Sequence, residues 1–298
     1  MCGIVGLFLK DPKLEPALGA LLTDMLITMT DRGPDSAGIA IYSGAGKDRA
    51  KITVQSARPG VDFHNLDADL AAAIGMPVLM LEKDSHAVLD VPLSQLAAAR
   101  SALAHLRPQV KVMSAGESIE IFKEVGLPRD VAARFGLSKM GGTHGIGHTR
   151  MATESAVTTM GAHPFSTGSD QCLVHNGSLS NHNSVRRELK RAGMTFETEN
   201  DTEVAAAFIS HKLQTGDTLG HAMAATLTDL DGFFTFVVGT KNGFGVVRDP
   251  IACKPAVMAE TADYVAFGSE YRALVNLPGI EGARVWEPEP ATVYFWER

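Results

Sequence analysis

Residues 2–9 read CGIVGLFL, and this stretch decides the fold of the N-terminal region. It is a short, continuous apolar run that ends at the sequence DPK, which is typical of a strand buried on both faces. Between residues 14 and 30 the apolar residues recur at helical intervals, which predicts an amphipathic helix. The sequence DRGPDS at 31–36 ends that helix, because Gly and Pro interrupt regular structure.

Beyond this turn, GIAIY at 38–42 and KITVQSA at 51–57 are predicted to be strands paired with each other. The stretch 58–142 has a different character, because it is rich in Ala and Leu and shows helical spacing at 66–75 and at 92–106. It contains no catalytic constellation and too little Gly and Pro for a linker. We therefore expect an ordered insertion of helical or mixed structure at about 58–142, within one domain that takes in residues 1–298.

Strand-like segments return after residue 142, and helical patterns lie between them at 181–192 and 201–230. This order of strands first, helices between and strands last predicts an α+β fold, layered as αββα, instead of alternating βαβ units.

The bulk composition excludes several classes of protein. The hydrophobic content of 45% and the net charge of −7 indicate a globular chain that binds neither nucleic acid nor an anionic membrane surface. Three cysteines in 298 residues argue against a disulfide framework, and the N-terminal segment turns charged too early for a secretory signal. We expect a cytoplasmic protein. Cys172 and Cys253 lie in apolar, strand-like contexts that predict buried thiols.

Cys2 carries the sharpest chemical indication. Removal of Met1 would leave a cysteine with a free α-amino group, whose pKa of roughly 7.7–8.0 suits a general base for its own thiol. An accidental cysteine at the second position is the alternative.

Other residues offer the groups that acyl transfer on an amino acid needs. Asn176 and the Gly177 amide could stabilise an oxyanion, although HNG is also an ordinary turn sequence. Arg150 suits a substrate carboxylate, and Asp201 suits an ammonium group, although a helix cap is the commoner role for an Asp at a helix start. His144 and His148 are not expected to bind a metal, because in a strand they lie ~13 Å apart.

Several motifs then occur together in a fixed order: MCGIVG at the N-terminus, RGPDSAG at 32–38, GHTRMAT at 147–153, HPF at 163–165, HNG at 175–177 and NDTEV at 200–204. In this combination the chain resembles the class II glutamine amidotransferases, whose glutaminase domains use an N-terminal nucleophile. The resemblance covers residues 1–57 and 143–275.

The resemblance implies an αββα sandwich of the N-terminal nucleophile hydrolase type and a γ-glutamyl thioester on Cys2. Asn176 and Gly177 would form the oxyanion hole. The residues implied to bind glutamine are Arg150 at the α-carboxylate, Asp201 at the α-ammonium, Thr153 and His163 in the pocket wall, and Arg32 in a loop that closes over it. The sequence departs from the TRWATHG pattern of sugar-phosphate synthases at Met151 and Glu154.

The glutaminase pattern continues to about residue 275, which leaves only a terminal strand and no acceptor-using domain. We therefore expect a subunit that passes ammonia to a separate synthase, with the insertion helping to form the docking surface. The chain resembles the amidotransferase subunit of glutamate synthase-like complexes, including N-methylglutamate synthase. That resemblance implies flavin and an iron–sulfur site in the partner, and no cofactor or metal in this chain, because three dispersed cysteines cannot hold a cluster.

Two alternatives remain open from the sequence. A free-standing γ-glutamyl amidase would use the same nucleophile without passing ammonia on. A catalytically silent subunit would bind glutamine for regulation only, and it would have no use for an N-terminal thiol.

Overall fold

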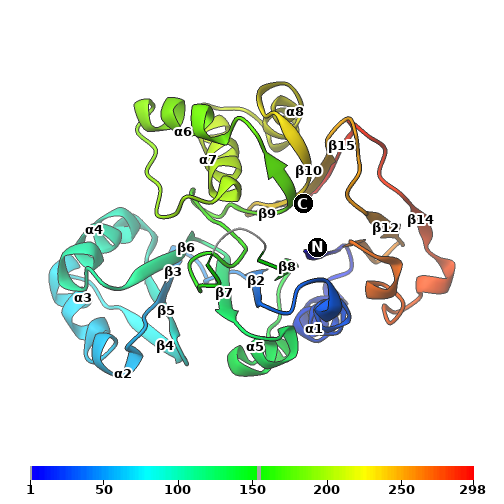
Figure 1. Ribbon diagram of the computed structural model, residues 1–298. Coiled ribbons are helices and arrows are strands. Elements are labelled where there is room, and N and C mark those ends of the chain that lie inside the picture. Colours follow the sequence, from blue (N-terminus) through cyan, green and yellow to red (C-terminus); the bar gives the residue numbers. More distant parts are fainter. Residues whose placement is uncertain (1, 153–155) are drawn as a thin grey trace.

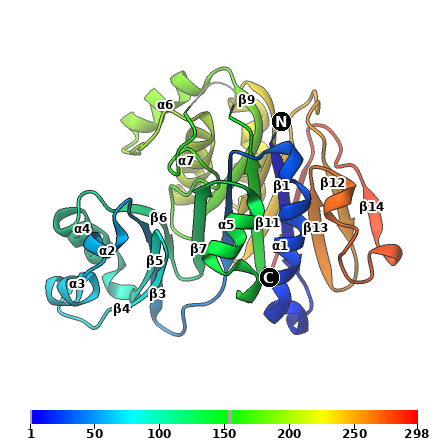
Figure 2. The same ribbon diagram turned by 60° about the horizontal axis from the view of Figure 1, so that its bottom comes forward.

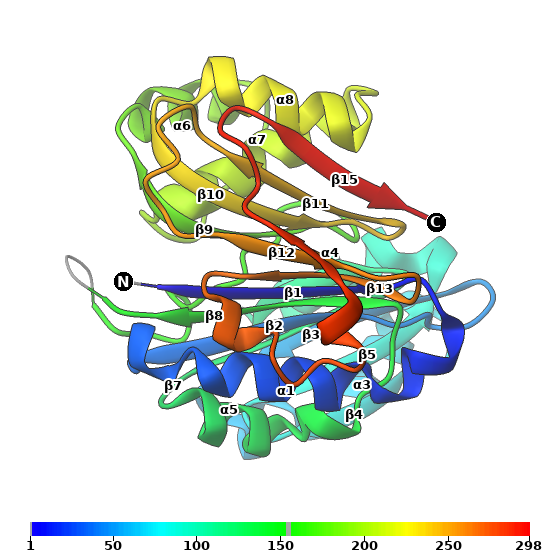
Figure 3. The same cartoon turned by 90° about the vertical axis from the view of Figure 1, so that its right-hand side faces the viewer.

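The computed structural model describes residues 2–152 and 156–298, which form two stacked antiparallel sheets with helices on both outer faces and a smaller third sheet beside them (Figures 1 and 3). The first sheet has the strand order β14 (Arg284–Trp286), β12 (Val257–Glu260), β13 (Tyr264–Gly268), β1 (Gly3–Leu9), β8 (His144–Arg150), β2 (Ser36–Tyr42) and β7 (Ile119–Val125). The second has the order β15 (Val293–Glu297), β11 (Gly243–Arg248), β10 (Gly232–Gly239) and β9 (Cys172–Leu179). The predicted α+β class and αββα layering are thus confirmed.

Strand β1 lies at the centre of the first sheet, between β8 and β13, and it is buried along its whole length. Ile4 and Phe8 face the second sheet, whereas Val5 and Leu7 face the helical layer outside. Successive side chains of a strand point to opposite faces, so a strand covered on both sides needs apolar residues at every position. This explains the unbroken apolar run at residues 2–9.

Helices cover the outer faces as the apolar spacing predicts. On the first sheet lie η1 (Pro12–Ala17), α1 (Leu18–Thr28), η2 (Thr30–Arg32), α5 (Pro128–Phe135), η4 (Leu137–Lys139), η5 (Tyr271–Ala273) and η6 (Ile280–Gly282). On the second lie α7 (Asp201–Gln214) and α8 (Leu219–Asp229), with α6 (His182–Arg191) packed against α7. The helix expected at 14–30 begins as a 3-10 turn around Pro16, and the pattern at 201–230 divides into two helices near Gly216, whose φ is +101°.

The third sheet belongs to an inserted subdomain that stands to one side of the sandwich (Figure 2). Its strands have the order β4 (Leu79–Lys83), β5 (His86–Pro92), β3 (Arg49–Gln55) and β6 (Lys111–Gly116). Its helices are α2 (Pro59–Asp62), α3 (Leu66–Ile74), η3 (Leu93–Gln95) and α4 (Leu96–Leu106). One apolar cluster that includes Ile52, Leu70 and Leu103 holds the sheet and helices together.

The structure corrects two expectations about this region. Strands β2 and β3 do not pair, because β2 lies between β8 and β7 whereas β3 joins the third sheet. The separate sheet takes in residues 49–116, so β7 and α5, expected within the insertion at 58–142, belong to the main sandwich. The chain leaves the sandwich for the subdomain and returns to it at one place, since the Ala45 amide donates to the Glu117 carbonyl oxygen at 2.9 Å.

The helices described within residues 2–152 and 156–298 are all too short or too polar to cross a membrane.

Candidate active site

A cavity of about 650 Å³ opens at the end of the two sheets where β1 begins and where β8 and β9 end. The register explains why the predicted residues meet there: Gly3 pairs with Thr149, so Cys2 and Arg150 extend from the same edge. The predicted residues that line the cavity are Cys2, Arg150, His163, Asn176, Gly177 and Asp201. Thr153, also predicted in the pocket wall, lies outside the described residues.

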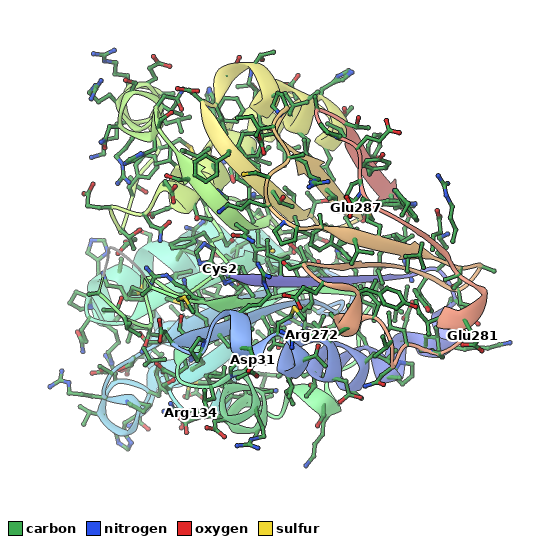
Figure 4. The ribbon with its side chains drawn as sticks, turned by 45° about the vertical axis from the view of Figure 1, so that its right-hand side comes forward. Cys2, Asp31, Arg134, Arg272, Glu281 and Glu287 are labelled. Atoms are coloured by element: carbon green, nitrogen blue, oxygen red, sulfur yellow. The ribbon has the colours of Figure 1, made fainter. Side chains whose placement is uncertain are left out.

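Cys2 is partly exposed and sits between the two sheets (Figure 4). Its carbonyl oxygen accepts one hydrogen bond from Arg32 Nε at 2.9 Å and another from Asn176 Nδ2 at 3.3 Å. These two donors fix the backbone of Cys2, and the residue lines the cavity.

Arg32 takes a different place from the one expected, because it is not part of a loop over the cavity. It is buried behind Cys2, and its second guanidinium arm pairs with Glu270 Oε1 at 2.6 Å. Glu270 in turn contacts Arg272 Nε at 2.7 Å, and Arg272 reaches Asp31 at 3.3 Å, as the neighbouring labels of Figure 4 illustrate. The hydrogen bond from Arg32, together with Arg272, lowers the pKa of Glu270. Arg32 therefore supports the backbone of Cys2 from behind.

Asn176 and Gly177 lie on β9, next to Cys2. Gly177 has a φ of +152°, and a Cβ there would come within 1.9 Å of the Phe233 carbonyl oxygen. Only glycine fits this position. The cavity wall beside the nucleophile therefore combines a side-chain amide with an unobstructed stretch of backbone, which is the donor arrangement that an oxyanion requires.

Asp201 is the first residue of α7, but the helix cap is its neighbour Asn200, whose side chain accepts from the Thr202 amide at 2.8 Å. The Asp201 carboxylate accepts instead from the Leu179 amide at 3.0 Å, and its other oxygen lies 3.8 Å from His175 Nδ1. Burial opposes ionisation of this group, but the contacts with His175 and Leu179 outweigh it and lower the pKa to about 2. Asp201 is thus a negative charge at the cavity, opposite in sign to Arg150.

Three buried histidines, His148, His163 and His175, lie in the cavity wall or behind it. The His163 and His148 rings stack at 4.0 Å, and the Thr202 hydroxyl lies 2.8 Å from His163 Nε2 and 3.1 Å from His175 Nδ1. Burial lowers the pKa of His148 to about 3 and that of His163 well below its ordinary value. His148 and His163 are therefore neutral at physiological pH, whereas Arg150 and Asp201 bring charges of opposite sign to the cavity.

Sequence reasoning missed several residues of the cavity: His175, Thr202, Ser178, His182, Lys254 and the segment 198–200. His175, Asn200 and Thr202 belong to the HNG and NDTEV motifs, so the motifs marked their region without indicating their roles. Lys254 follows the sequence VVRDPIAC, and its position depends on contacts that no local pattern shows. Arg248 holds this loop through the carbonyl oxygens of Ala252 and Lys254.

The same loop corrects an expectation about the cysteines. Cys253 is exposed, because it lies in the loop and not in a strand, whereas Cys172 is buried on β9 as predicted. Burial raises the pKa of the Cys172 thiol to about 12, so it is not a nucleophile at neutral pH. Across residues 2–152 and 156–298, no group of three or more His, Cys, Asp or Glu side chains is arranged to hold a metal ion.

Comparisons with known proteins identify the family of the chain. The glutamine amidotransferase domain family matches residues 148–276. Over its whole length the chain is 70% identical to the glutamine amidotransferase-like protein GlxB of Rhizobium meliloti (strain 1021), covering 98% of that protein. It is 34% identical to a putative glutamine amidotransferase of Methanothermobacter thermautotrophicus, with 99% of each chain covered.

Two solved structures share the fold. The phosphoribosylpyrophosphate amidotransferase of B. subtilis aligns with 99% of this chain at 20% identity and a TM-score of 0.62. A structure described as the allosteric regulatory enzyme of purine biosynthesis also aligns with 99% of this chain, at 21% identity and a TM-score of 0.64. The chain spans 47% of each of these two proteins. Because a relative that is 70% identical matches its whole length, the chain belongs to the glutamine amidotransferases.

Proposed function

We propose that this protein hydrolyses L-glutamine to glutamate and ammonia through a thioester on Cys2, and that the ammonia passes to a separate synthase subunit. The observation that carries the proposal is the meeting of Cys2, Asn176, Gly177, Arg150 and Asp201 at one cavity. A free α-amino acid carries a carboxylate and an ammonium group, and the cavity offers a complementary cation, Arg150, and a complementary anion, Asp201.

The chemistry follows from these positions. After removal of Met1, the α-amine of Cys2 takes the thiol proton while Sγ attacks the side-chain amide carbon of glutamine. The Asn176 amide and the Gly177 N–H stabilise the oxyanion that forms. Collapse breaks the C–N bond, and the departing nitrogen takes the proton as ammonia. Water, deprotonated by the same amine, then hydrolyses the thioester to glutamate.

Arg150 and Asp201 hold the substrate α-carboxylate and α-ammonium in this scheme, with His163 in the pocket wall. Arg32 acts on the nucleophile and not on glutamine. Its contact with the Cys2 carbonyl supports this assignment.

Covalent labelling tests the nucleophile directly. The purified protein is treated with 6-diazo-5-oxo-L-norleucine, and its intact mass and N-terminal peptide are measured. We expect loss of Met1 and one adduct, on Cys2, which excess glutamine prevents. Retained Met1, or labelling confined to Cys172 or Cys253, would contradict the mechanism. A Cys2→Ala variant is the control for adducts elsewhere.

The recipient of the ammonia is proposed from the sequence resemblance. The resemblance to glutamate synthase-like complexes, including N-methylglutamate synthase, favours partner subunits that carry flavin and an iron–sulfur site. The three free cysteines of this chain favour a reducing cytoplasm. Turnover of γ-glutamyl amides other than glutamine, at equal rate with and without any partner, would instead identify a free-standing amidase.

The inserted subdomain is the predicted docking surface, and the structure shows where to remove it. Tyr42 pairs with Ile119, so a short turn in place of residues 47–116 would leave β2 and β7 as a hairpin. We expect this deletion to abolish assembly with the synthase while the sandwich still folds and Cys2 is still labelled. Binding of the synthase to the deletion variant would refute the docking role.

A further inference from the structure

One wall of the cavity is a loop without helix or strand. Residues 156–164, which we call the pocket loop, contribute Ala156, Thr158, Gly161 and His163 to the lining. Without a regular backbone ladder, the position of such a loop depends on the side chains that anchor it.

Two neighbouring residues of β7, the edge strand of the first sheet, provide anchors. Lys123 Nζ is buried and donates to the carbonyl oxygens of Met160, Ala162 and Pro164 at 3.2, 2.7 and 3.2 Å. Glu124 accepts a short hydrogen bond from the Thr159 hydroxyl. Adjacent residues of a strand point to opposite faces, so the pocket loop is held on both sides of the sheet edge.

Glu124 also reaches the inserted subdomain. Its second oxygen accepts from Ser85 Oγ at 3.0 Å, in the turn between β4 and β5, and lies 3.7 Å from Arg134 of α5. Arg134 pairs with Asp84 of the same turn at 2.6 Å, in the helical layer below the sheet that carries Cys2 (Figure 4). The turn is firmly seated, because His86 is fully buried with its ring edge-on to Phe135 at 4.8 Å.

A single buried carboxylate, 8% exposed, thus joins a turn of the inserted subdomain to the wall of the glutamine cavity. A buried carboxylate is stable only while donors surround it, and here they come from both sides. If the donors on one side move away, the carboxylate must be stabilised by the donors on the other side alone.

We propose that Glu124 is a positioning residue for glutamine binding, which couples the β4–β5 turn of the inserted subdomain to the pocket loop through Ser85 and Thr159. The inference rests on the proposed glutaminase function. It assigns the inserted subdomain a part in setting glutamine affinity, separate from any part in docking.

The experiment measures the glutamine concentration that halves the rate of Cys2 labelling by 6-diazo-5-oxo-L-norleucine, which needs neither turnover nor a partner. Thr159→Val and Glu124→Gln should each raise this concentration about fivefold, the value of one hydrogen bond. The labelling rate at saturating reagent should stay within about twofold of wild type. Thr159→Ser, which keeps the hydroxyl, should restore the wild-type value.

Glu120→Gln is the matched control. Glu120 lies on the same strand and pairs with Lys51 of the inserted subdomain at 2.6 Å, but it has no contact with the pocket loop. We expect glutamine protection in this variant to equal that of wild type. Thermal unfolding of every variant identifies any loss of affinity that merely follows loss of stability.

A double-mutant cycle tests the coupling itself. Ser85→Ala should weaken glutamine protection in the wild-type background and have no further effect in Thr159→Val. Additive effects, an unchanged protection concentration in Ser85→Ala, or an equal change in Glu120→Gln would each overturn the inference. If Cys2 of the wild-type protein is not labelled at all, the proposed function fails instead, so the two failures are distinguishable.

Discussion

Arg32 donates a hydrogen bond from Nε to the carbonyl oxygen of Cys2 at 2.9 Å, which places a buried guanidinium behind the nucleophile. We expect Arg32→Gln to lower the maximal rate of Cys2 labelling about tenfold, because the backbone of the nucleophile loses a charged donor. Glutamine protection should change less than twofold. Arg272→Gln is the control, since Arg272 contacts Glu270 but not Cys2. A weakened glutamine affinity with an unchanged labelling rate would show that Arg32 binds substrate after all.

Asn176 is predicted to act in the transition state. Asn176→Ala removes one oxyanion donor, and we expect the rate of thioester formation to fall about 100-fold with little change in glutamine affinity. Rapid-quench measurement of the acyl-enzyme gives this rate. Ser178→Ala, which changes a side chain elsewhere in the same cavity, should retain most activity. Equal losses in the two variants would argue against an oxyanion role.

Asp201 is expected to remain ionised in the folded protein until the pH falls close to 2. Because its folded pKa of about 2 lies below the ordinary value of 3.8, the charged form stabilises the fold above pH 4, and this contribution disappears as the pH falls through 2. Asp201→Asn should therefore lower the free energy of unfolding by about 2 kcal/mol at neutral pH and by progressively less in acid. Urea denaturation at several pH values measures the difference. A constant difference between pH 6 and 2 would exclude an electrostatic origin.

Glutamine binding should also depend on the Asp201 charge. The neutral amide of Asp201→Asn cannot attract the substrate ammonium, so we expect at least tenfold weaker protection of Cys2 by glutamine. γ-Glutamyl compounds without the α-ammonium group should lose little. Equal losses for both kinds of ligand would place Asp201 in a purely structural role.

Lys123 provides a second test of pH dependence, in the alkaline range. Burial lowers its pKa from 10.5 to about 7, so between these values the unfolded chain binds more protons than the folded one. Stability contributed by this residue therefore rises with pH across that window. The free energy of unfolding of wild type, measured relative to Lys123→Met, should increase from pH 7 to pH 10. A difference that stays constant over this range would mean that the folded protein holds Lys123 charged.

The sequence predicted those parts of the site whose chemistry is local. Cys2, Asn176 and Asp201 each have a functional group suited to amide hydrolysis, and their motifs place them at the ends of regular elements. The β1 strand was predictable because a short, continuous apolar run is typical of a strand buried on both faces. His175 and Thr202 were missed, since one hydroxyl shared between two histidines 39 and 27 residues away depends on the folded arrangement alone.

Long-range pairing explains the errors. Strand β3 follows β2 closely, which favours a hairpin, but the inserted sheet offers β3 two partners and β7 takes its place beside β2. Arg32 was misplaced because its partner Glu270 is 238 residues distant. Cys253 is exposed because Arg248 and Asp249 shape a loop where the apolar sequence indicated a strand. Nothing in the spacing of residues near 124 and 159 indicates their contact.

The central place of β1 has a consequence for synthesis on the ribosome. Its neighbours are β8 and β13. The strand partner of Val5 on one side, Gly147, must therefore be synthesised first, and the partner on the other side, Gly268, much later. At roughly 5–20 residues per second, translation of that distance takes on the order of tens of seconds. Until β8 has been translated, β1 has neither of its strand partners, which would leave the initiator methionine accessible to a peptidase. The nucleophile is therefore assembled near the end of translation, although it is encoded at the beginning.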